Sequence, residues 1–271
     1  MKVLIAVDME GISGVTCWDH VLPGHSEYPR GRRWMTADVN AAVEGAAQAG
    51  ADEIVVTDGH WDGSNILIEE LDPRARLING TPSPLSMIQG VADGVDAAVF
   101  IGYHAMAGTR NAILDHTWSS LRMHNFWLNG TLAGEIAMNA AGCGHFGVPV
   151  VAISGDQSAC AEASILIPGI KTAQVKKANG RMNAECLSLQ QAQQVITSAV
   201  KQGVELRSQI KPYTLPGKVT FAVEFYRSDM ADWAEGLPGA KRVNARILEY
   251  TGDDIISASR AFRAMVGLTQ V

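Results

Sequence analysis

Two carboxylates, two residues apart, stand at the end of the first apolar run of the chain. The run at 2–7 stops at Asp8, and Glu10 and Gly11 follow directly. In an extended segment, residues two apart point to the same side, so Asp8 and Glu10 are expected to face the same space. Like charges at the end of a buried strand repel each other unless a positive group lies between them. The pair therefore predicts a cation site, provided that other ligands reach it.

Two later apolar runs also end in residues that can bind a metal ion. His60 follows the run at 53–57, and His104 follows the run at 96–101. The carboxyl ends of parallel strands form the usual ligand crevice of an α/β sheet. Glu135 lies at the start of a predicted helix and adds a carboxylate. The residues expected to converge are Asp8, Glu10, His60, His104 and Glu135.

Two imidazoles and three carboxylates suit zinc, with manganese or cobalt as substitutes. Five ligands are too many for a single catalytic zinc ion with an open position. They suit two ions that share one carboxylate as a bridge. We expect Asp8 to be that bridge, with Glu10 and His104 completing one site and His60 and Glu135 the other.

Each of these residues also has an ordinary structural explanation. Asp8 could cap a helix or a turn, and Glu10 could be a solvated loop residue. His60 and His104 could be turn residues, and Glu135 could be favoured by the helix dipole. The joint pattern favours the metal site, because all five residues lie at element ends on one side of the predicted sheet.

His116 lies in the segment 105–130, which has no clear periodicity. Beside two metal ions, this histidine could act as a general acid or base, or stabilise a tetrahedral intermediate. A surface histidine held by Asp115 is equally consistent with the sequence. Asp156 follows another apolar run and could either orient a ligand histidine or cap the next helix.

The elements that must position these residues alternate between strand and helix. Strands are predicted at 2–7, 53–57, 75–78, 96–101 and 148–154, and helices at 35–49, 84–91, 132–143 and 188–200. After 212–217 the pattern changes to alternating apolar and polar residues at 219–225, as in a half-exposed antiparallel strand. A helix is predicted at 254–265. The predicted fold is α/β: a mostly parallel sheet flanked by helices forms a metal-binding catalytic domain (1–211), followed by a small α+β domain (212–271) that could serve assembly.

Composition excludes several classes of partner and site. The net charge of −6 provides no basic surface for nucleic acid. No apolar stretch approaches the roughly 20 residues of a membrane span, and the chain opens on a strand rather than a signal peptide. Its four cysteines form no Cys-x-x-Cys pair, which favours free thiols in the cytoplasm and disfavours thiolate-bound zinc.

These motifs resemble those of the bacterial D-aminopeptidases of the dipeptide-transport operon, over essentially the full length of the chain. The resemblance implies a zinc metallopeptidase with two Zn²⁺ ions per chain, in which Asp8 bridges the ions and His116 is the catalytic histidine. It also implies ring-shaped homodecamers whose active sites face an inner cavity that admits short peptides. The motifs that carry it are Asp8-Met9-Glu10-Gly11, Asp58-Gly59-His60, Gly102-Tyr103-His104, Asp115-His116-Thr117 and Gly134-Glu135.

The predicted activity is zinc-dependent aminopeptidase cleavage of short peptides, with a D-amino acid at the amino end and metal-activated water as the nucleophile. His116 is assigned to proton transfer or oxyanion stabilisation. A two-metal phosphoesterase, or another amide hydrolase, could use the same ligands. A non-catalytic protein with structural ions fits less well, because structural zinc sites are usually closed and rich in thiolates.

Overall fold

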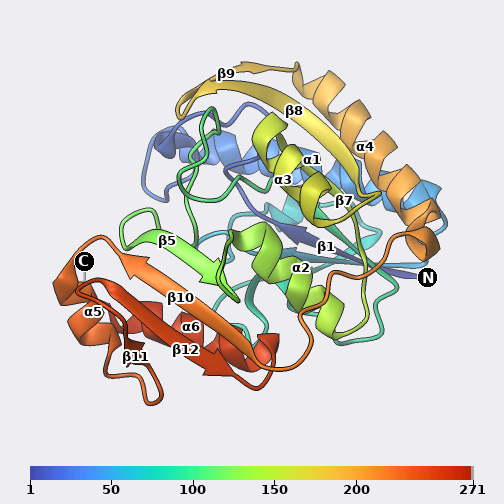
Figure 1. The fold of residues 1–271 in the computed structure, drawn as a ribbon. Coiled ribbons are helices and arrows are strands. Elements are labelled where there is room, and N and C mark those ends of the chain that lie inside the picture. Colours follow the sequence, from blue (N-terminus) through green and yellow to red (C-terminus); the bar gives the residue numbers. More distant parts are fainter. Residues whose placement is uncertain (270–271) are drawn as a thin grey trace.

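The computed structural model describes residues 1–269, and its larger sheet is mostly parallel (Figure 1). The strand order is β3-β2-β1-β4-β7-β8-β9, and only the edge pair β8–β9 is antiparallel. Apolar side chains fill the central strands, because helices cover both faces. The strands are β1 (Lys2–Val7), β2 (Glu53–Asp58), β3 (Ala75–Ile78), β4 (Ala97–Ile101), β7 (Val150–Asp156), β8 (Lys171–Gly180) and β9 (Asn183–Cys186).

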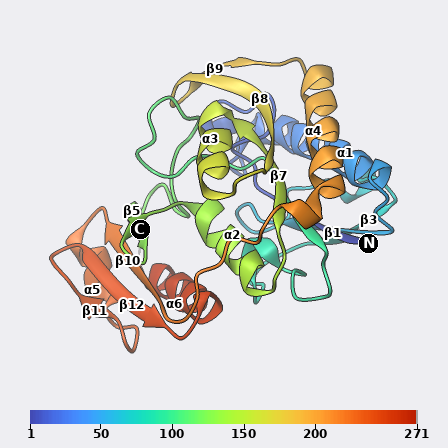
Figure 2. The ribbon, with the colours of Figure 1, turned by 45° about the vertical axis from the view of Figure 1, so that its right-hand side comes forward.

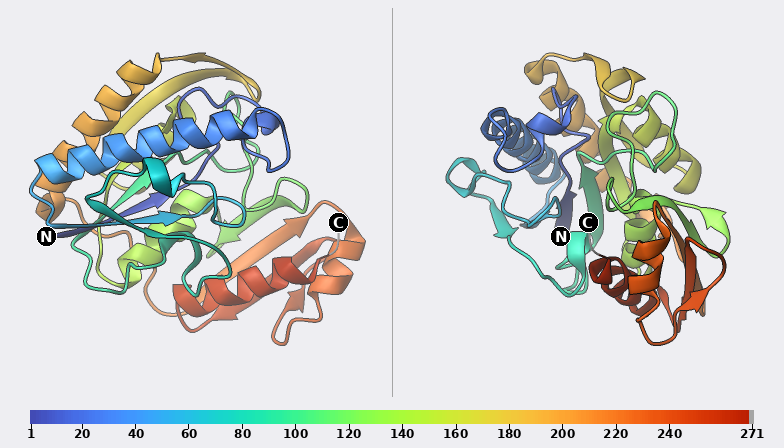
Figure 3. Two further views of the ribbon diagram at one scale, coloured as in Figure 1. Left: turned by 180° about the vertical axis from the view of Figure 1, so that it is seen from behind. Right: turned by 90° about the vertical axis from the view of Figure 1, so that its left-hand side faces the viewer.

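Helices α1 (Tyr28–Gln48) and α4 (Leu189–Glu205) pack side by side on one face of this sheet. Helices α2 (Glu135–His145) and α3 (Gln157–Leu166) cover the other face, as the two views of Figure 3 show. Short 3₁₀ helices lie in the connections, at Trp18–His20, Ile68–Glu70, Ser86–Ile88 and Arg207–Gln209. Within residues 1–269, no helix combines the length and apolar character needed to cross a membrane.

A second, antiparallel sheet has the order β11-β12-β10-β5-β6. Helices α5 (Ser228–Ala234) and α6 (Ile255–Leu268) pack on it, and α6 contacts α2 of the larger unit (Figure 2). Two of its strands come from the middle of the chain, so the sheet joins segments on both sides of residue 212. The division into domains at 212 stays a prediction. The strands are β5 (Met123–Leu128), β6 (Thr131–Leu132), β10 (Val219–Phe225), β11 (Lys241–Arg242) and β12 (Ile247–Gly252).

The predicted fold class is confirmed, and so are most of the predicted elements. The alternation at 219–225 is a strand with its odd-numbered residues buried. Ser188 and Asp254 cap α4 and α6 through reciprocal capping boxes. Helix α1 begins at Tyr28, seven residues before the predicted start, because Gly31 rather than an apolar side chain packs in its first turns.

One prediction about the connections was wrong, and one strand was not predicted. The segment 84–91 is not an α-helix: Ser86 has a left-handed φ of 55°, and only a 3₁₀ turn forms there. Strand β5 was missed because its pairing with β10 shifts register between Glu224 and Phe225. The shift buries Met123 and Phe126, three residues apart, so the period of two is lost.

Candidate metal centre

The five predicted ligands converge at the carboxyl ends of β1, β2 and β4. His60 Nδ1 lies 3.2 Å from Asp8 Oδ1 and 3.2 Å from Glu10 Oε2. His104 Nε2 lies 3.4 Å from Asp8 Oδ2 and 3.1 Å from Glu135 Oε1. All five side chains are buried. The two oxygens of Asp8 therefore face different histidines, which suits a carboxylate shared by two sites.

The shorter distances favour a division of the ligands other than the one expected from the sequence, although Asp8, Glu10 and His104 also offer ligand atoms within 4.8 Å of one another. His60 lies with Glu10 on one side of Asp8, whereas His104 lies with Glu135 on the other. The sequence gives only the order of the ligands along the chain. The register of the parallel strands decides which pairs become neighbours: β1 lies between β2, which carries His60 beyond its end, and β4, which carries His104.

Main-chain carbonyls hold each histidine ring from its far side. His60 Nε2 donates to Val21 O at 2.9 Å, and His104 Nδ1 donates to Ala105 O at 3.0 Å. The nitrogens that face the carboxylates are then free to offer a lone pair. Metal-bound histidines usually have such a partner on the other ring nitrogen, which fixes the tautomer and the ring orientation.

Three atoms of the cluster are buried and lack a hydrogen-bond partner among residues 1–269: Asp8 Oδ2, Glu10 Oε2 and His104 Nε2. Buried polar atoms in proteins are almost always paired. Here Asp8 Oδ2 and His104 Nε2 face each other at 3.4 Å, and Asp8, Glu10 and His104 each offer a ligand atom within 4.8 Å of the others, which suits a cation between them. Carboxylate oxygens and imidazole nitrogens are ligands that zinc accepts, so the residues fit a zinc centre.

Protons occupy the place of a cation when no metal ion is bound. Burial, followed by the neighbouring charge of Glu10, raises the pKa of Asp8 to about 7. Burial lowers the pKa of His60, but the charges and hydrogen bonds of Glu10 and Asp8 together outweigh this effect and leave the pKa well above its ordinary value. The pKa of His104 is also raised well above its ordinary value, mainly by the charge of Glu135. The cluster thus needs positive charge, which imidazolium protons or metal ions can supply.

Two glycines let the ends of β1 and β4 approach closely enough to form the cluster. A Cβ atom on Gly11 would lie 2.0 Å from Tyr103 O, inside the main chain that leads to His104. Gly102 has a φ of 71°, and a Cβ atom there would lie 2.3 Å from Asp8 O. No other residue fits at either position without moving a candidate metal ligand.

His116 lies against the cluster. Its ring stacks on His104 with centroids 4.0 Å apart, and its Nε2 lies 3.9 Å from Glu10 Oε1. Nδ1 donates to Leu114 O at 2.8 Å, so the lone pair at Nε2 faces the carboxylates. Burial and the nearby His104 lower the pKa of His116, which keeps this imidazole neutral near pH 7.

The irregular segment that carries His116 is anchored by Asp156. One carboxylate oxygen of Asp156 caps α3 by accepting from the N–H groups of Ser158 and Ala159. The other accepts from the N–H of Ile113 at 2.7 Å. Of the two roles considered for Asp156, the helix cap is confirmed, and no ligand histidine contacts it within the described chain.

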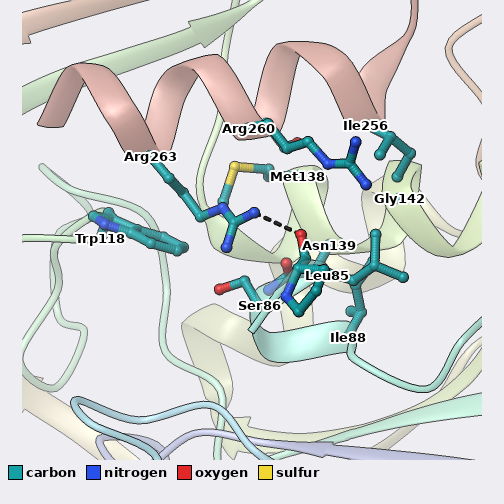
Figure 4. A pocket seen from close by; sticks show the side chains of 12 residues that line it. Leu85, Ser86, Ile88, Trp118, Met138, Asn139, Gly142, Ile256, Arg260 and Arg263 are labelled. Atoms are coloured by element: carbon teal, nitrogen blue, oxygen red, sulfur yellow. Dashed lines mark hydrogen bonds between the residues drawn. The ribbon is translucent and has the colours of Figure 1, made fainter. Parts of the chain in front are cut away.

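A narrow pocket lies beside α2, one to two turns beyond Glu135 (Figure 4). Trp118 forms one wall, and its main-chain N–H donates to Glu135 Oε1 at 2.8 Å. Arg260 and Arg263 of α6 also line the pocket, and neither has a carboxylate within salt-bridge distance in the described chain. Arg263 donates to the carbonyl oxygens of Ser83 and Pro84. The pocket is therefore positively charged.

Sequence reasoning missed two buried charges near Glu10. Asp38 lies on the apolar face of α1, and burial raises its pKa to about 6. Lys176 is on β8, and burial lowers its pKa to about 8. A carboxylate between Met35 and Ala42 on a helix face was a signal for Asp38. Lys176 has other lysines nearby in the sequence, and nothing in that pattern indicated that Lys176 is buried.

Comparison with known proteins gives one consistent result. Residues 1–264 match the family described as D-aminopeptidase. A D-aminopeptidase of Bacillus subtilis (strain 168) is 34% identical over 269 residues, which span 99% of this chain and 97% of that protein. The solved structure of the Zn-dependent D-aminopeptidase DppA from Bacillus subtilis, described as a self-compartmentalizing protease, superposes with a TM-score of 0.96 at 33% identity. That match covers 99% of this chain and 97% of the other.

Proposed function

Because this chain belongs to the D-aminopeptidase family, we propose that it hydrolyses the first peptide bond of short peptides that begin with a D-amino acid. It is a metallopeptidase, and the solved relative is zinc-dependent. The observation that carries the proposal is the group of buried, unpaired ligand atoms at Asp8, Glu10 and His104. A peptidase without a metal ion would have no use for such a costly cluster.

We propose two zinc ions per chain, with Asp8 between them. Glu10 and His60 would complete one site, while His104 and Glu135 would complete the other, as their distances support. When bound, zinc polarises a carbonyl oxygen and makes water acidic enough to ionise near neutral pH. Glu135 also accepts the N–H of Trp118, which fixes this carboxylate before any metal ion binds.

His116 is the proposed proton carrier. Its Nδ1–H is held by Leu114 O, so only Nε2 can take or release a proton on the side of the cluster. The lowered pKa makes it a base rather than an imidazolium in the resting site. After it accepts a proton at Nε2, it can return that proton to the departing amine.

The pocket of Figure 4 supports a short substrate with a free carboxyl end. Helix α2 rises roughly 6 Å from Glu135 to Asn139, which lines the pocket, and one extended residue spans about 3.5 Å. A peptide whose first bond lies at Glu135 would then bring its carboxylate towards Arg260 and Arg263 after one or two further residues. Pairing of a guanidinium with that carboxylate would favour dipeptides and tripeptides.

We also propose that the protein works as an oligomer, as the self-compartmentalizing relative does. A closed assembly would place the site inside a cavity and restrict entry to short or unfolded peptides. Sedimentation of the purified protein tests this directly: a single species of one chain would refute it.

The activity is tested by zinc loading and substrate comparison. The zinc-loaded protein should hydrolyse D-Ala-D-Ala and D-Ala-Gly, with much slower cleavage of L-Ala-L-Ala. A phosphodiester such as bis(p-nitrophenyl) phosphate should remain intact under the same conditions. Rapid cleavage of the phosphodiester, with stable D-alanyl peptides, would instead favour the phosphoesterase alternative.

A further inference from the structure

Lys176 is a buried lysine whose ammonium group binds the loop after β1 and, among residues 1–269, no carboxylate. Its side chain is 2% exposed, and Nζ donates to the carbonyl oxygens of Glu10 at 2.7 Å, Ile12 at 2.8 Å and Val15 at 2.7 Å. These bonds use all three N–H groups of the ammonium. The loop from Glu10 to Val15 therefore folds around one cation.

Asp38 holds the same loop through its N–H and hydroxyl groups. Its Oδ2 accepts from Ser13 N at 2.9 Å, and its Oδ1 accepts from Ser13 Oγ at 2.6 Å. Asp38 has no exposed surface. Lys176 on β8 and Asp38 on α1 therefore hold the same short loop. Lys176 binds its carbonyl oxygens, and Asp38 binds its N–H and hydroxyl groups.

Buried charges of this kind are expensive, and apolar side chains of similar volume would often stabilise the fold as well or better. What the pair supplies is a fixed main-chain conformation. Glu10 is itself one of the residues bound by Lys176, and its carboxylate lies 3.2 Å from His60. A rigid main chain leaves only side-chain rotation to be ordered when Glu10 binds a metal ion.

We propose that Lys176 and Asp38 are positioning residues for Glu10 and set the affinity of the metal ion that Glu10 and His60 would share. The proposal rests on the metal centre proposed above. Ordering one or two residues of freed backbone would weaken binding by roughly 10- to 100-fold. The ion between His104 and Glu135 should be unaffected, because neither residue contacts Lys176 or Asp38.

The test is a zinc titration of the metal-free protein against a chromophoric chelator, in wild type and in Lys176→Met. Wild type should show two binding steps, and Glu10→Gln identifies the step that depends on Glu10. In Lys176→Met that step should weaken by about 10- to 100-fold, with the other unchanged. Equal weakening of both steps, or no change in either, would overturn the proposal.

A control variant separates positioning from general loss of stability. Val175 is the neighbouring residue on β8 and has no exposed surface, so Val175→Ala should destabilise the fold. It makes no hydrogen bond to the loop, and both zinc affinities should stay at their wild-type values. Weakening of the Glu10 step in Val175→Ala, to the extent seen in Lys176→Met, would argue against a specific role of the lysine.

Ser13→Ala decides the question if Lys176→Met does not fold. This change removes only the hydroxyl bond to Asp38 and keeps the N–H bond. It should weaken the Glu10 step by several-fold and leave the other step alone; wild-type affinity at both steps would overturn the proposal. A wild-type protein that binds one ion, or leaves D-alanyl peptides intact, would refute the proposed function instead. Comparison of the variants would then still show whether Lys176 affects the affinity of that single ion.

Discussion

Asp8→Asn should stabilise the metal-free protein and lose at least half of the stabilisation that zinc gives to wild type. Burial, followed by the charge of Glu10, raises the pKa of Asp8 from its ordinary 3.8 to about 7. A pKa higher by about 3 pH units corresponds to about 4 kcal/mol of unfavourable free energy for the ionised form. Asparagine has nearly the same shape and no charge, so it removes this cost from the metal-free fold.

The sign of the pH dependence follows from proton binding. Between pH 4 and pH 7, folded Asp8 keeps a proton that the unfolded chain releases, so the stability of metal-free wild type falls as the pH rises. Metal-free Asp8→Asn lacks that contribution. The two proteins should be about equally stable near pH 4, while at pH 8 the variant should be more stable by up to about 4 kcal/mol.

Zinc should narrow this difference, and should reverse it if the variant binds no ion. Each ion that binds only the folded state adds about 2.7 kcal/mol at a free concentration of 100 times its Kd, so two ions add roughly 5 kcal/mol to wild type. A neutral amide cannot bridge two cations, and Asp8→Asn should retain at most one ion. Urea denaturation at pH 8, with chelator and with zinc, measures both effects alongside the zinc content per chain.

Two results would refute this reasoning. Metal-free Asp8→Asn that is less stable than wild type at pH 8 would mean that Asp8 stabilises the fold by itself, through His60 and His104. Retention of two tightly bound zinc ions in the variant would mean that Asp8 is not shared between the sites. Glu69→Gln is a suitable control, because Glu69 is exposed and makes no contact with the cluster.

Three further changes probe the remaining parts of the site. His116→Ala should keep both zinc ions and lose about 10²- to 10⁴-fold in kcat, as expected for a lost proton carrier; loss of an ion would place His116 among the ligands. Glu135→Gln should lower the zinc content by one ion and spare the one beside Glu10, which metal analysis of the dialysed protein would show. Arg260→Met should raise KM for D-Ala-D-Ala roughly 10-fold and leave KM for D-Ala-D-Ala amide unchanged, with the exposed Arg227→Met as its control; equal effects on both substrates would exclude carboxylate recognition.

The parts of the fold that follow a local pattern could be predicted from the sequence. Strands β1 and β4 are apolar runs and β2 has an apolar centre, and Asp8, His60 and His104 follow just beyond their ends. Because the carboxyl ends of parallel strands meet at one edge, ligands remote in sequence could be grouped. His116 lies in a segment without periodicity, where the sequence left its role open, and the resemblance to a known family identified it as the catalytic histidine.

What could not be predicted depends on pairing between remote segments. Which ligands share a site is decided by the strand order β2-β1-β4, and the sequence carries no direct statement of that order. Strand β5 pairs with β10, nearly 100 residues away, through a register shift that disrupts its pattern. Lys176 is separated from Glu10 by 166 residues, so only the folded chain shows that one holds the other.

One balance of free energies explains both the ligand cluster and its supporting residues, Lys176 and Asp38. The carboxyl groups of Asp8, Glu10 and Glu135 lie close together, although burial disfavours their negative charges. Lys176 and Asp38 are buried at further cost. If these groups served to stabilise the fold, the facing atoms of Asp8, Glu10 and His104 would have hydrogen-bond partners. Within the described residues they have none. The arrangement is instead what a preformed cation site requires: the fold holds the ligands apart from solvent and in place, and the bound ion recovers the free energy that their confinement costs. It follows that substitutions which relax the cluster should stabilise the metal-free protein while they weaken zinc binding, and that substitutions in the supports should weaken binding of the ion beside Glu10.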